Sequence, residues 1–389
     1  MSAVEDWREF ANSLGRDRAT TEGGSSWSLI FARRDRTIAL PAAELPEPAS
    51  LRFFVRTARK WWWAWFLLSC HRFACRLLPQ AQLSASQHGE LQRILSRPEE
   101  VPGPLSSDIL AIQFGSSGPL QKVTVLASAS DGSQLVAKLA LRESADDRID
   151  IEAGCLGRLA VLPGLAVHVP AVVGTGKTWT GRRYFVMRAV SGKASRETFE
   201  KSHAELLRGI SGVDCRVVAW QESALVQDIE TRLTTLAKSG ADGLKVLSAG
   251  WFAACRALAG ERLPLCLNHG DFASWNLLRT TQGLVALDWE YARPHWNPMG
   301  DFFHFHLIAA ALDGRLRKGH VRRDLLLSKA SDHAADVFAL DRAFTSSIAA
   351  PLLLVYMVDT VSFYAVVSGG IERQHPVVDS YLQWITELT

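Results

Sequence analysis

Strand-like and helix-like segments are segregated along this chain, and their order restricts the folds that it can adopt. Short apolar runs of alternating pattern predict strands in the first half, at 109–114, 122–128, 134–141, 169–173 and 184–190. After residue 200 helical periodicity dominates, most clearly at 224–238 and 243–259. A strand block followed by a helical block is typical of the α+β class. We therefore expect a small antiparallel sheet followed by a mainly helical region.

The chain has 389 residues, which is enough for two or three domains. Prolines at 102–104 mark a change in composition between a first part without chemical motifs and the strand block. We expect an accessory region at 1–100, a sheet lobe at 101–192 and a helical lobe at 193–389. Within the accessory region the patterns predict short strands at 28–32 and 37–40 and a helix at 87–96.

Bulk composition excludes several classes of protein. The apolar fraction of 48% and the charged fraction of 21% are those of a globular chain, and a net charge of +3 argues against nucleic-acid binding. Six cysteines without a CxxC pair indicate reduced thiols in a cytoplasmic protein. The acidic N-terminus is not a secretory signal. The apolar stretch 352–367 follows Pro351 and contains Asp359, so we expect a buried core helix there.

One segment, 51–80, is both basic and rich in tryptophan. It holds six basic side chains, no acid and four of the thirteen tryptophans, Trp61, Trp62, Trp63 and Trp65. Three interpretations compete: an apolar brace under the rest of the protein, peripheral contact with the inner face of a membrane, or a site for a polyanionic or lipid-linked substrate. At 100° per residue Arg56 and Arg59 fall about 180° from Arg72 and Arg76 on a helix, which disfavours an amphipathic surface helix and favours the brace.

The segment that carries chemistry begins at residue 265 and reads LCLNHGDFASWNLL, followed by LVALDWE from residue 284. A short apolar strand delivers His269 and Asp271 into a loop, and Asn276 lies five residues beyond Asp271. A second apolar strand leads to Asp288, seventeen residues after Asp271. Two carboxylates and a carboxamide supply the hard oxygen ligands that Mg²⁺ prefers. Phosphoryl transfer requires such a group, because one carboxylate orients an attacking hydroxyl while others hold the metal.

These residues match the pattern His-Gly-Asp-x-x-x-x-Asn followed by Asp-Trp-Glu, and here the chain resembles the aminoglycoside phosphotransferase and choline kinase-like family. The resemblance covers residues 100–389 and implies a bilobal protein kinase-like fold. It implies that Asp271 is the catalytic base, that Asn276 and Asp288 bind Mg²⁺, and that His269 supports the loop. Glu290 is a further candidate for the metal shell or for substrate contact. Asp301 resembles the family's downstream aspartate, which braces the catalytic loop.

A kinase also needs a nucleotide-binding lobe, and the strand block offers one. The turn formed by Gly115, Ser116, Ser117 and Gly118 lies between the first two strands of this block, and it fits a phosphate loop and a plain hairpin equally well. Lys138 lies in an apolar strand that resembles the kinase lysine strand, which implies contact with the α- and β-phosphates.

Two further assignments complete the nucleotide lobe. The partner of Lys138 would be Glu152 on the next helix, with Asp150 as the competitor, since Glu143 is too close to the strand end. The segment 187–190, including Met187 and Ala189, would supply backbone groups to the adenine edge. The run Gly174–Thr178 resembles the end of a P-loop but lacks the first glycine and a following helix, and we interpret it as a hairpin turn.

The resemblance implies a kinase that uses ATP or GTP with Mg²⁺ and phosphorylates a hydroxyl of a sugar, amino alcohol, antibiotic or lipid-linked acceptor. The region 302–389 holds nine acidic and eight basic residues, whereas a pocket for a polycationic antibiotic is expected to be more acidic. The alternative is a catalytically silent, kinase-like protein that binds nucleotide or scaffolds a partner. The residues that the resemblance implies as catalytic base and Mg²⁺ ligands are all present in this chain, which argues against that alternative.

Overall fold

The structure is a computed structural model, and it describes residues 3–15, 25–33, 36–42, 80–96, 108–129, 131–240, 243–371 and 375–389. The tryptophan-rich segment 51–80 lies outside these residues except for Gln80. The chain divides into two compact units, unit 1 with Met1–Ser195 and Leu278–Glu290, and unit 2 with Arg196–Leu277 and Tyr291–Thr389. Unit 1 is built on an antiparallel sheet and unit 2 is mainly helical, so the predicted α+β class is confirmed.

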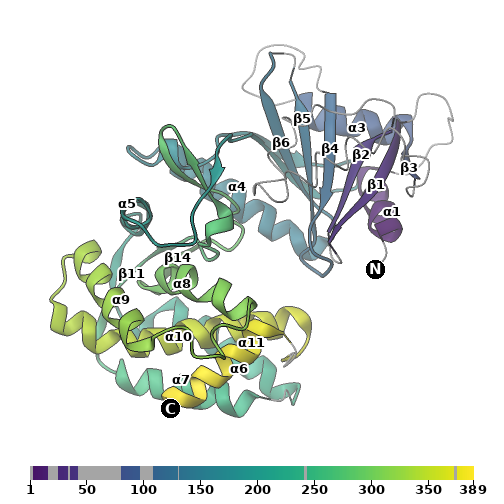
Figure 1. Cartoon of the computed structure of the whole chain (residues 1–389). Helices are drawn as coiled ribbons and strands as arrows, with labels where there is room; N and C mark the ends of the chain where they lie inside the picture. The colour runs from purple at the N-terminus through teal and green to yellow at the C-terminus, as the bar shows by residue number, and fades with distance from the viewer. Residues whose placement is uncertain are drawn as a thin grey trace. The chain divides into compact units, whose positions relative to one another are not determined.

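Within the described residues unit 1 combines three α-helices with most of the strands, and Figure 1 shows these elements. In chain order its elements are α1 (Ala3–Leu14), β1 (Ser25–Arg33), β2 (Arg36–Pro41), β3 (Gln80–Leu83), α3 (Ala85–Ser96), β4 (Asp108–Phe114), β5 (Lys122–Ser128), β6 (Gln134–Ala140), a 3₁₀ turn (Glu143–Ala145), α4 (Asp146–Ala160), a second 3₁₀ turn (Ala166–His168), β7 (Val172–Lys177), β8 (Arg183–Arg188), β9 (Lys193–Ala194), β12 (Leu277–Thr280) and β13 (Gly283–Ala286). The predicted strands at 109–114, 122–128 and 134–141 agree with β4, β5 and β6 to within one residue at each end.

The main sheet of unit 1 has eight antiparallel strands in the order β3-β1-β2-β4-β5-β6-β8-β7. Strands from the first hundred residues therefore continue the sheet that also contains the lysine strand β6. The join is made by β2 and β4, where Ile38 pairs with Gln113 and Ala39 with Ile112. The described part of the accessory region is thus built into the sheet lobe.

Helices α1 and α3 anchor this N-terminal addition. The aromatic rings of Trp7 and Phe10 on α1 contact Phe114 on β4, and all three side chains are buried. Glu9 on α1 accepts two hydrogen bonds from the guanidinium of Arg142, at 2.9 and 3.1 Å. Since burying such large aromatic side chains stabilises a fold by a few kcal/mol each, α1 is an integral part of the hydrophobic core.

The prediction of a hairpin turn at Gly174–Thr178 is wrong for most of that run. Residues 174–177 belong to β7, which pairs with β8 from Val172 to Lys177, and the turn follows at 178–182. Packing explains why glycine occupies a strand here. A Cβ atom on Gly176 would lie 2.6 Å from the hydroxyl of Tyr184 on the paired strand, so a larger residue would force the Tyr184 side chain to move.

Unit 2 consists of seven helices and three short strands within the described residues. In chain order these are α5 (Lys201–Ser211), β10 (Arg216–Ala219), α6 (Ala224–Lys238), α7 (Leu244–Ala257), β11 (Arg262–Asn268), β14 (Arg293–Trp296), α8 (Gly300–Leu312), α9 (Arg323–Phe338), α10 (Arg342–Ser368) and α11 (Pro376–Leu388), with 3₁₀ turns at Trp220–Glu222 and Ser274–Asn276. Strand β11 lies between β10 and β14 in an antiparallel sheet.

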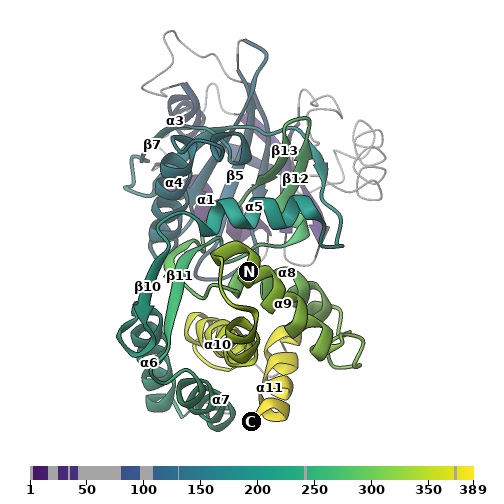
Figure 2. The same ribbon diagram turned by 90° about the vertical axis from the view of Figure 1, so that its left-hand side faces the viewer.

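Helix α10 is the central element of unit 2. It contacts α6, α7, α8, α9 and α11, and Figure 2 shows it in the middle of this group. Asp341 caps it by accepting hydrogen bonds from two backbone amides of the first turn, so the helix begins ten residues before the predicted 352–367 and passes through Pro351. Of the described helices, α10 alone is long and apolar enough to cross a membrane, but 67% of its most apolar window is buried in the protein. That burial agrees with the predicted core helix.

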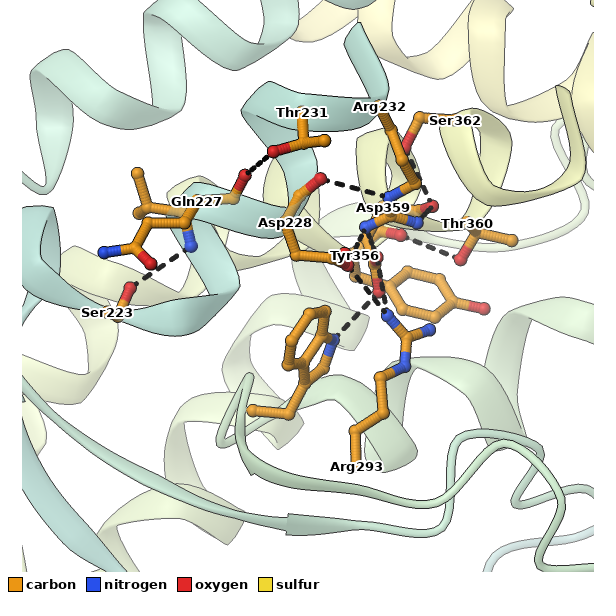
Figure 3. Close-up of polar contacts among 12 residues, drawn as sticks. Ser223, Gln227, Asp228, Thr231, Arg232, Arg293, Tyr356, Asp359, Thr360 and Ser362 are labelled. Carbon is orange, nitrogen blue, oxygen red and sulfur yellow. Dashed lines mark hydrogen bonds and ion pairs between the residues drawn. The ribbon is translucent and has the colours of Figure 1, made fainter. Parts of the chain in front are cut away.

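Asp359 lies at the centre of a buried polar cluster on α10 (Figure 3). One carboxylate oxygen accepts hydrogen bonds from Arg232 at 2.5 Å and Arg293 at 3.0 Å, and the other accepts one from the indole N–H of Trp296 at 3.0 Å. Burial raises the pKa of Asp359, but the charges of Arg293 and Arg232 outweigh it and hold the pKa below its usual value. The cluster ties α6 and β14 to α10.

Two partly buried histidines lie where α5, α8 and α9 meet. The rings of His306 and His333 pack against Phe199 and Phe302. Burial is the main cause that lowers the pKa of each to about 4 from a usual value of 6.5. Lys329 and His203 add to this for His306, and Arg208 adds to it for His333. Both imidazoles are therefore neutral in the folded protein near neutral pH.

These histidines should make the fold sensitive to acid. The unfolded chain takes up protons at His306 and His333 near pH 6.5 but the folded chain only near pH 4, so the free energy of unfolding falls as the pH falls between those values. We expect a loss of ~2 kcal/mol per histidine between pH 7 and pH 5. Urea unfolding at both pH values measures it. Between pH 7 and pH 5 the double variant His306→Phe/His333→Phe should lose less unfolding free energy than the wild type. An equal loss in the wild type and the double variant would contradict this explanation.

Candidate active site

The predicted catalytic loop follows β11 in unit 2 and is braced by an aspartate. Asp301, in the first turn of α8, accepts hydrogen bonds from the backbone N–H of His269 at 2.7 Å and of Gly270 at 2.9 Å. Gly270 has a φ of 80°, and a Cβ atom there would lie 2.2 Å from the carbonyl oxygen of Tyr291. Only glycine can therefore occupy this turn. His269 is fully buried, and its Nδ1 accepts a hydrogen bond from the N–H of Asp271 at 3.2 Å.

Asp271 is held from two sides while part of it remains open. The amide of Asn276 donates to the carboxylate Oδ2 at 2.7 Å and to the Asp271 carbonyl at 3.0 Å. The imidazole Nε2 of His304 lies 2.8 Å from the other oxygen, Oδ1. A quarter of the Asp271 side chain is exposed. Asp271 is thus a carboxylate that is held in place and remains partly exposed, two properties that a general base needs.

The predicted lysine, its glutamate partner and the Asp-Trp-Glu segment lie in unit 1. Lys138 on β6 donates to Glu152 on α4 at 2.5 Å and to Asp288, just beyond β13, at 2.9 Å. Lys138 and Glu152 are buried, and a buried charge is tolerated when it is paired in this way. The competitor Asp150 instead pairs with Arg183 at 3.1 Å. The structure therefore joins the lysine strand, the following helix and the Asp-Trp-Glu segment through one ion-pair cluster.

A second lysine, Lys122, enters the same cluster from β5. Its ammonium lies 3.0 Å from Asp288, 2.9 Å from Glu290 and 3.8 Å from Glu152. Burial alone would lower the pKa of Lys122, but the three carboxylates raise it well above its usual value. For Asp288, burial alone would raise the pKa. The positive charges of Lys122 and Lys138 outweigh burial and hold that pKa well below its usual value.

The carboxylates of this cluster fit a divalent cation bound together with nucleotide. Burial raises the pKa of Glu290 to about 7, and one of its oxygens is buried without a hydrogen-bond partner, as is one oxygen of Glu152. A hard cation would compensate such oxygens, and Mg²⁺ commonly uses one or two carboxylates plus substrate phosphates. In the described part of the chain no three His, Cys, Asp or Glu side chains form a metal site by themselves.

Lys122 neutralises the carboxylates that a metal would otherwise face, so its removal should expose them. We expect Lys122→Met to lower the melting temperature of the free protein, because breaking one partner of a buried ion pair costs ~3–5 kcal/mol. Added Mg²⁺ should then raise the melting temperature of the variant more than that of the wild type. The exposed Lys177→Met is the matched control in the same unit. If Mg²⁺ raises the melting temperature of wild type and Lys122→Met equally, Lys122 and Mg²⁺ do not compete for the same carboxylates.

The remaining predicted nucleotide contacts lie in unit 1. The turn Gly115–Gly118 lies between β4 and β5 with both serines exposed. The N–H of Gly115 donates a hydrogen bond to the carbonyl of Lys122, the first residue of β5. Met187 is buried in β8. The N–H of Ala189 donates to the carbonyl of Gln134. An adenine contact at 187–190 would therefore use backbone groups other than that amide.

Sequence reasoning missed Lys122 and His304. Lys122 opens an apolar strand four residues beyond Gly118, and a charge at the start of a buried strand is the signal that points to a site. His304 lies three residues after Asp301 on a helix that is otherwise almost entirely apolar, and that spacing places both side chains on one helical face.

A match to a protein-family model agrees with the resemblance read from the motifs. The model of the phosphotransferase enzyme family matches residues 116–336. A search of the curated proteins found no significant match. Similar solved structures include a putative fructosamine-3-kinase from Thermobifida fusca, with 17% identity, a TM-score of 0.49 and coverage of 76% of this chain and 97% of that one. Another is an aminoglycoside phosphotransferase from Alicyclobacillus acidocaldarius, with 17% identity, a TM-score of 0.44 and coverage of 71% and 88% respectively.

Proposed function

This chain belongs to the phosphotransferase enzyme family, and on that basis we propose that it is a Mg²⁺-dependent small-molecule kinase. It would use ATP or GTP to phosphorylate a hydroxyl group. The observation that carries the proposal is the geometry of Asp271, a partly exposed carboxylate fixed by Asn276 in a loop braced by Asp301. A catalytic base requires this combination of rigidity and access.

The residues take the following parts in the proposed reaction. Asp271 orients the acceptor hydroxyl and receives its proton as the acceptor oxygen bonds to the γ-phosphorus. The bond from that phosphorus to the β–γ bridging oxygen breaks, and the nucleoside diphosphate leaves. Lys138, fixed by Glu152, would contact the nucleotide phosphates. Asn276 and Asp288 would hold Mg²⁺, which neutralises charge on the phosphates when bound.

The proposed acceptor is an uncharged or weakly charged hydroxyl compound. The balance of nine acids and eight bases in 302–389 favours a sugar, an amino alcohol or a lipid-linked glycan precursor over a polycationic antibiotic. The tryptophan-rich segment supports the lipid-linked option, because Trp and Arg or Lys side chains favour the membrane interface.

A panel of acceptors tests this proposal. The purified full-length protein is incubated with Mg²⁺ and ATP or GTP, with one sugar, amino alcohol, aminoglycoside or lipid-linked glycan at a time, and nucleoside diphosphate release is measured. We expect one class to raise the rate above that with water alone, and Asp271→Asn to abolish the increase. Tight nucleotide binding without acceptor-dependent release in any class would favour the catalytically silent alternative.

A further inference from the structure

A continuous chain of hydrogen bonds leads from the predicted base into the core of unit 2. Nε2 of His304 on α8 lies 2.8 Å from Oδ1 of Asp271, and Nδ1 of the same ring lies 3.2 Å from the hydroxyl of Tyr356 on α10. That hydroxyl lies 2.9 Å from the hydroxyl of Tyr381 on α11. His304, Tyr356 and Tyr381 are 6%, 5% and 0% exposed, so solvent does not compete for these hydrogen bonds.

The direction of each hydrogen bond follows from the chemistry of its members. A carboxylate that serves as a base is ionised and can only accept, so Nε2 of His304 must carry the proton. In the neutral imidazole Nδ1 then accepts, and its donor is the hydroxyl of Tyr356. The oxygen of Tyr356 accepts in turn from Tyr381. Burial raises the pKa of both tyrosines, which keeps their protons in place.

The charged groups around His304 support this arrangement. Asp271 faces it from the loop after β11, and Asp301 lies one helical turn earlier on α8, where its oxygens accept from the backbone of His269 and Gly270. From α10 it is contacted by the hydroxyl of Tyr356, which in turn contacts the hydroxyl of Tyr381 on α11. The side-chain amide of Asn276 donates to the other carboxylate oxygen of Asp271. Both carboxylate oxygens of the base are thus oriented by a donor.

We propose that His304 is a positioning residue for the base, held as the Nε2–H tautomer by Tyr356 and Tyr381 so that it donates to Asp271. This inference rests on the proposed function of Asp271. Because Nε2 already carries a proton, His304 does not take up the proton that Asp271 removes from the acceptor. It fixes the orientation of the carboxylate through this hydrogen bond.

Two measurements test the proposal, one of them independent of activity. In the full-length protein with ¹⁵N-labelled histidine, the His304 signals are identified by their loss in His304→Gln, and their shifts report the tautomer. In the second measurement, Mg²⁺-ATP hydrolysis is followed for His304→Leu, which lacks the donor, and for His304→Gln, which keeps one near Nε2. The exposed His320→Leu is the matched control.

We expect the Nε2–H tautomer in the wild type and loss of this preference in Tyr356→Phe. His304→Leu should lower kcat by about 10-fold to 100-fold with an unchanged KM for ATP. His304→Gln should restore most of the loss. If His304→Leu does not fold, the tautomer of His304 in the wild type and in Tyr356→Phe decides whether the proposal holds.

An Nδ1–H tautomer, unchanged kcat in His304→Leu, or equal losses in the Leu and Gln variants would each overturn the positioning role. Asp271→Asn separates this failure from failure of the proposed function. If Asp271→Asn is inactive while His304→Leu is fully active, only the inference about His304 fails. If Asp271→Asn hydrolyses ATP as fast as the wild type, the assignment of the base fails.

Discussion

Replacing Asp271 by Asn should lower phosphate transfer by about 10²-fold to 10⁴-fold, the usual contribution of a general base. The amide has nearly the same shape and can still accept a hydrogen bond from Asn276, but it cannot take the proton of the acceptor hydroxyl. Nucleotide affinity should change little, because the Lys138 cluster lies in the other unit and does not include Asp271. Steady-state kinetics and calorimetric titration with ATP measure the two quantities separately.

The control for this substitution is Asp313→Asn, an exposed aspartate that follows the end of α8. It removes one negative charge from the same unit and should leave both kcat and nucleotide affinity at the wild-type level. A fall in nucleotide affinity as large as the fall in kcat for Asp271→Asn would mean that the residue supports binding, and it would count against the assignment as base.

The largest effect on stability is expected at Asp359. Asp359→Ala leaves the guanidinium groups of Arg232 and Arg293 and the indole N–H of Trp296 without their common acceptor. Arg232 is 8% exposed, so water cannot easily replace the lost contact. We expect the free energy of unfolding to fall by ~3–5 kcal/mol, as for other buried ion pairs that lose one partner. Urea unfolding followed by circular dichroism measures the change.

A surface pair provides the contrast. Asp332 pairs with Arg342 at 3.2 Å, with both side chains more than half exposed, and Asp332→Ala should cost less than ~1 kcal/mol. Asp359→Asn should fall between the two, because the amide keeps one acceptor oxygen. Equal costs for Asp359→Ala and Asp332→Ala would show that the buried cluster does not stabilise unit 2.

The sequence predicted local structure well where local signals determine it. Strand β5 and helix α6 begin and end where their patterns indicate, because apolar periodicity follows the burial of each face. The run at 174–177 was misjudged because glycine usually marks turns, whereas here Gly176 leaves room in a strand for the side chain of Tyr184 on the neighbouring strand. A pattern within one segment cannot show what a paired strand places against it.

In the candidate site, too, some contacts follow from the local sequence and others appear only in the folded structure. The spacing of Asp271 and Asn276 predicts a shared loop, and the structure places their side chains in contact. The approach of Lys122 to Asp288 joins residues 166 positions apart and depends on the sheet as a whole. The contact between Asp271 and His304 likewise depends on how α8 packs beside the loop. Such contacts between distant segments need the folded structure.

The most direct test of the central claim is transfer of labelled phosphate. The wild-type protein and the Asp271→Asn and Asp288→Asn variants are each incubated with Mg²⁺, γ-labelled ATP or GTP and a metabolite extract that includes lipids, and labelled products are identified by mass. A kinase should produce one labelled hydroxyl compound with the wild type and almost none with either variant. Equal labelling by all three proteins, or none by a wild type that binds nucleotide, would contradict the assignment.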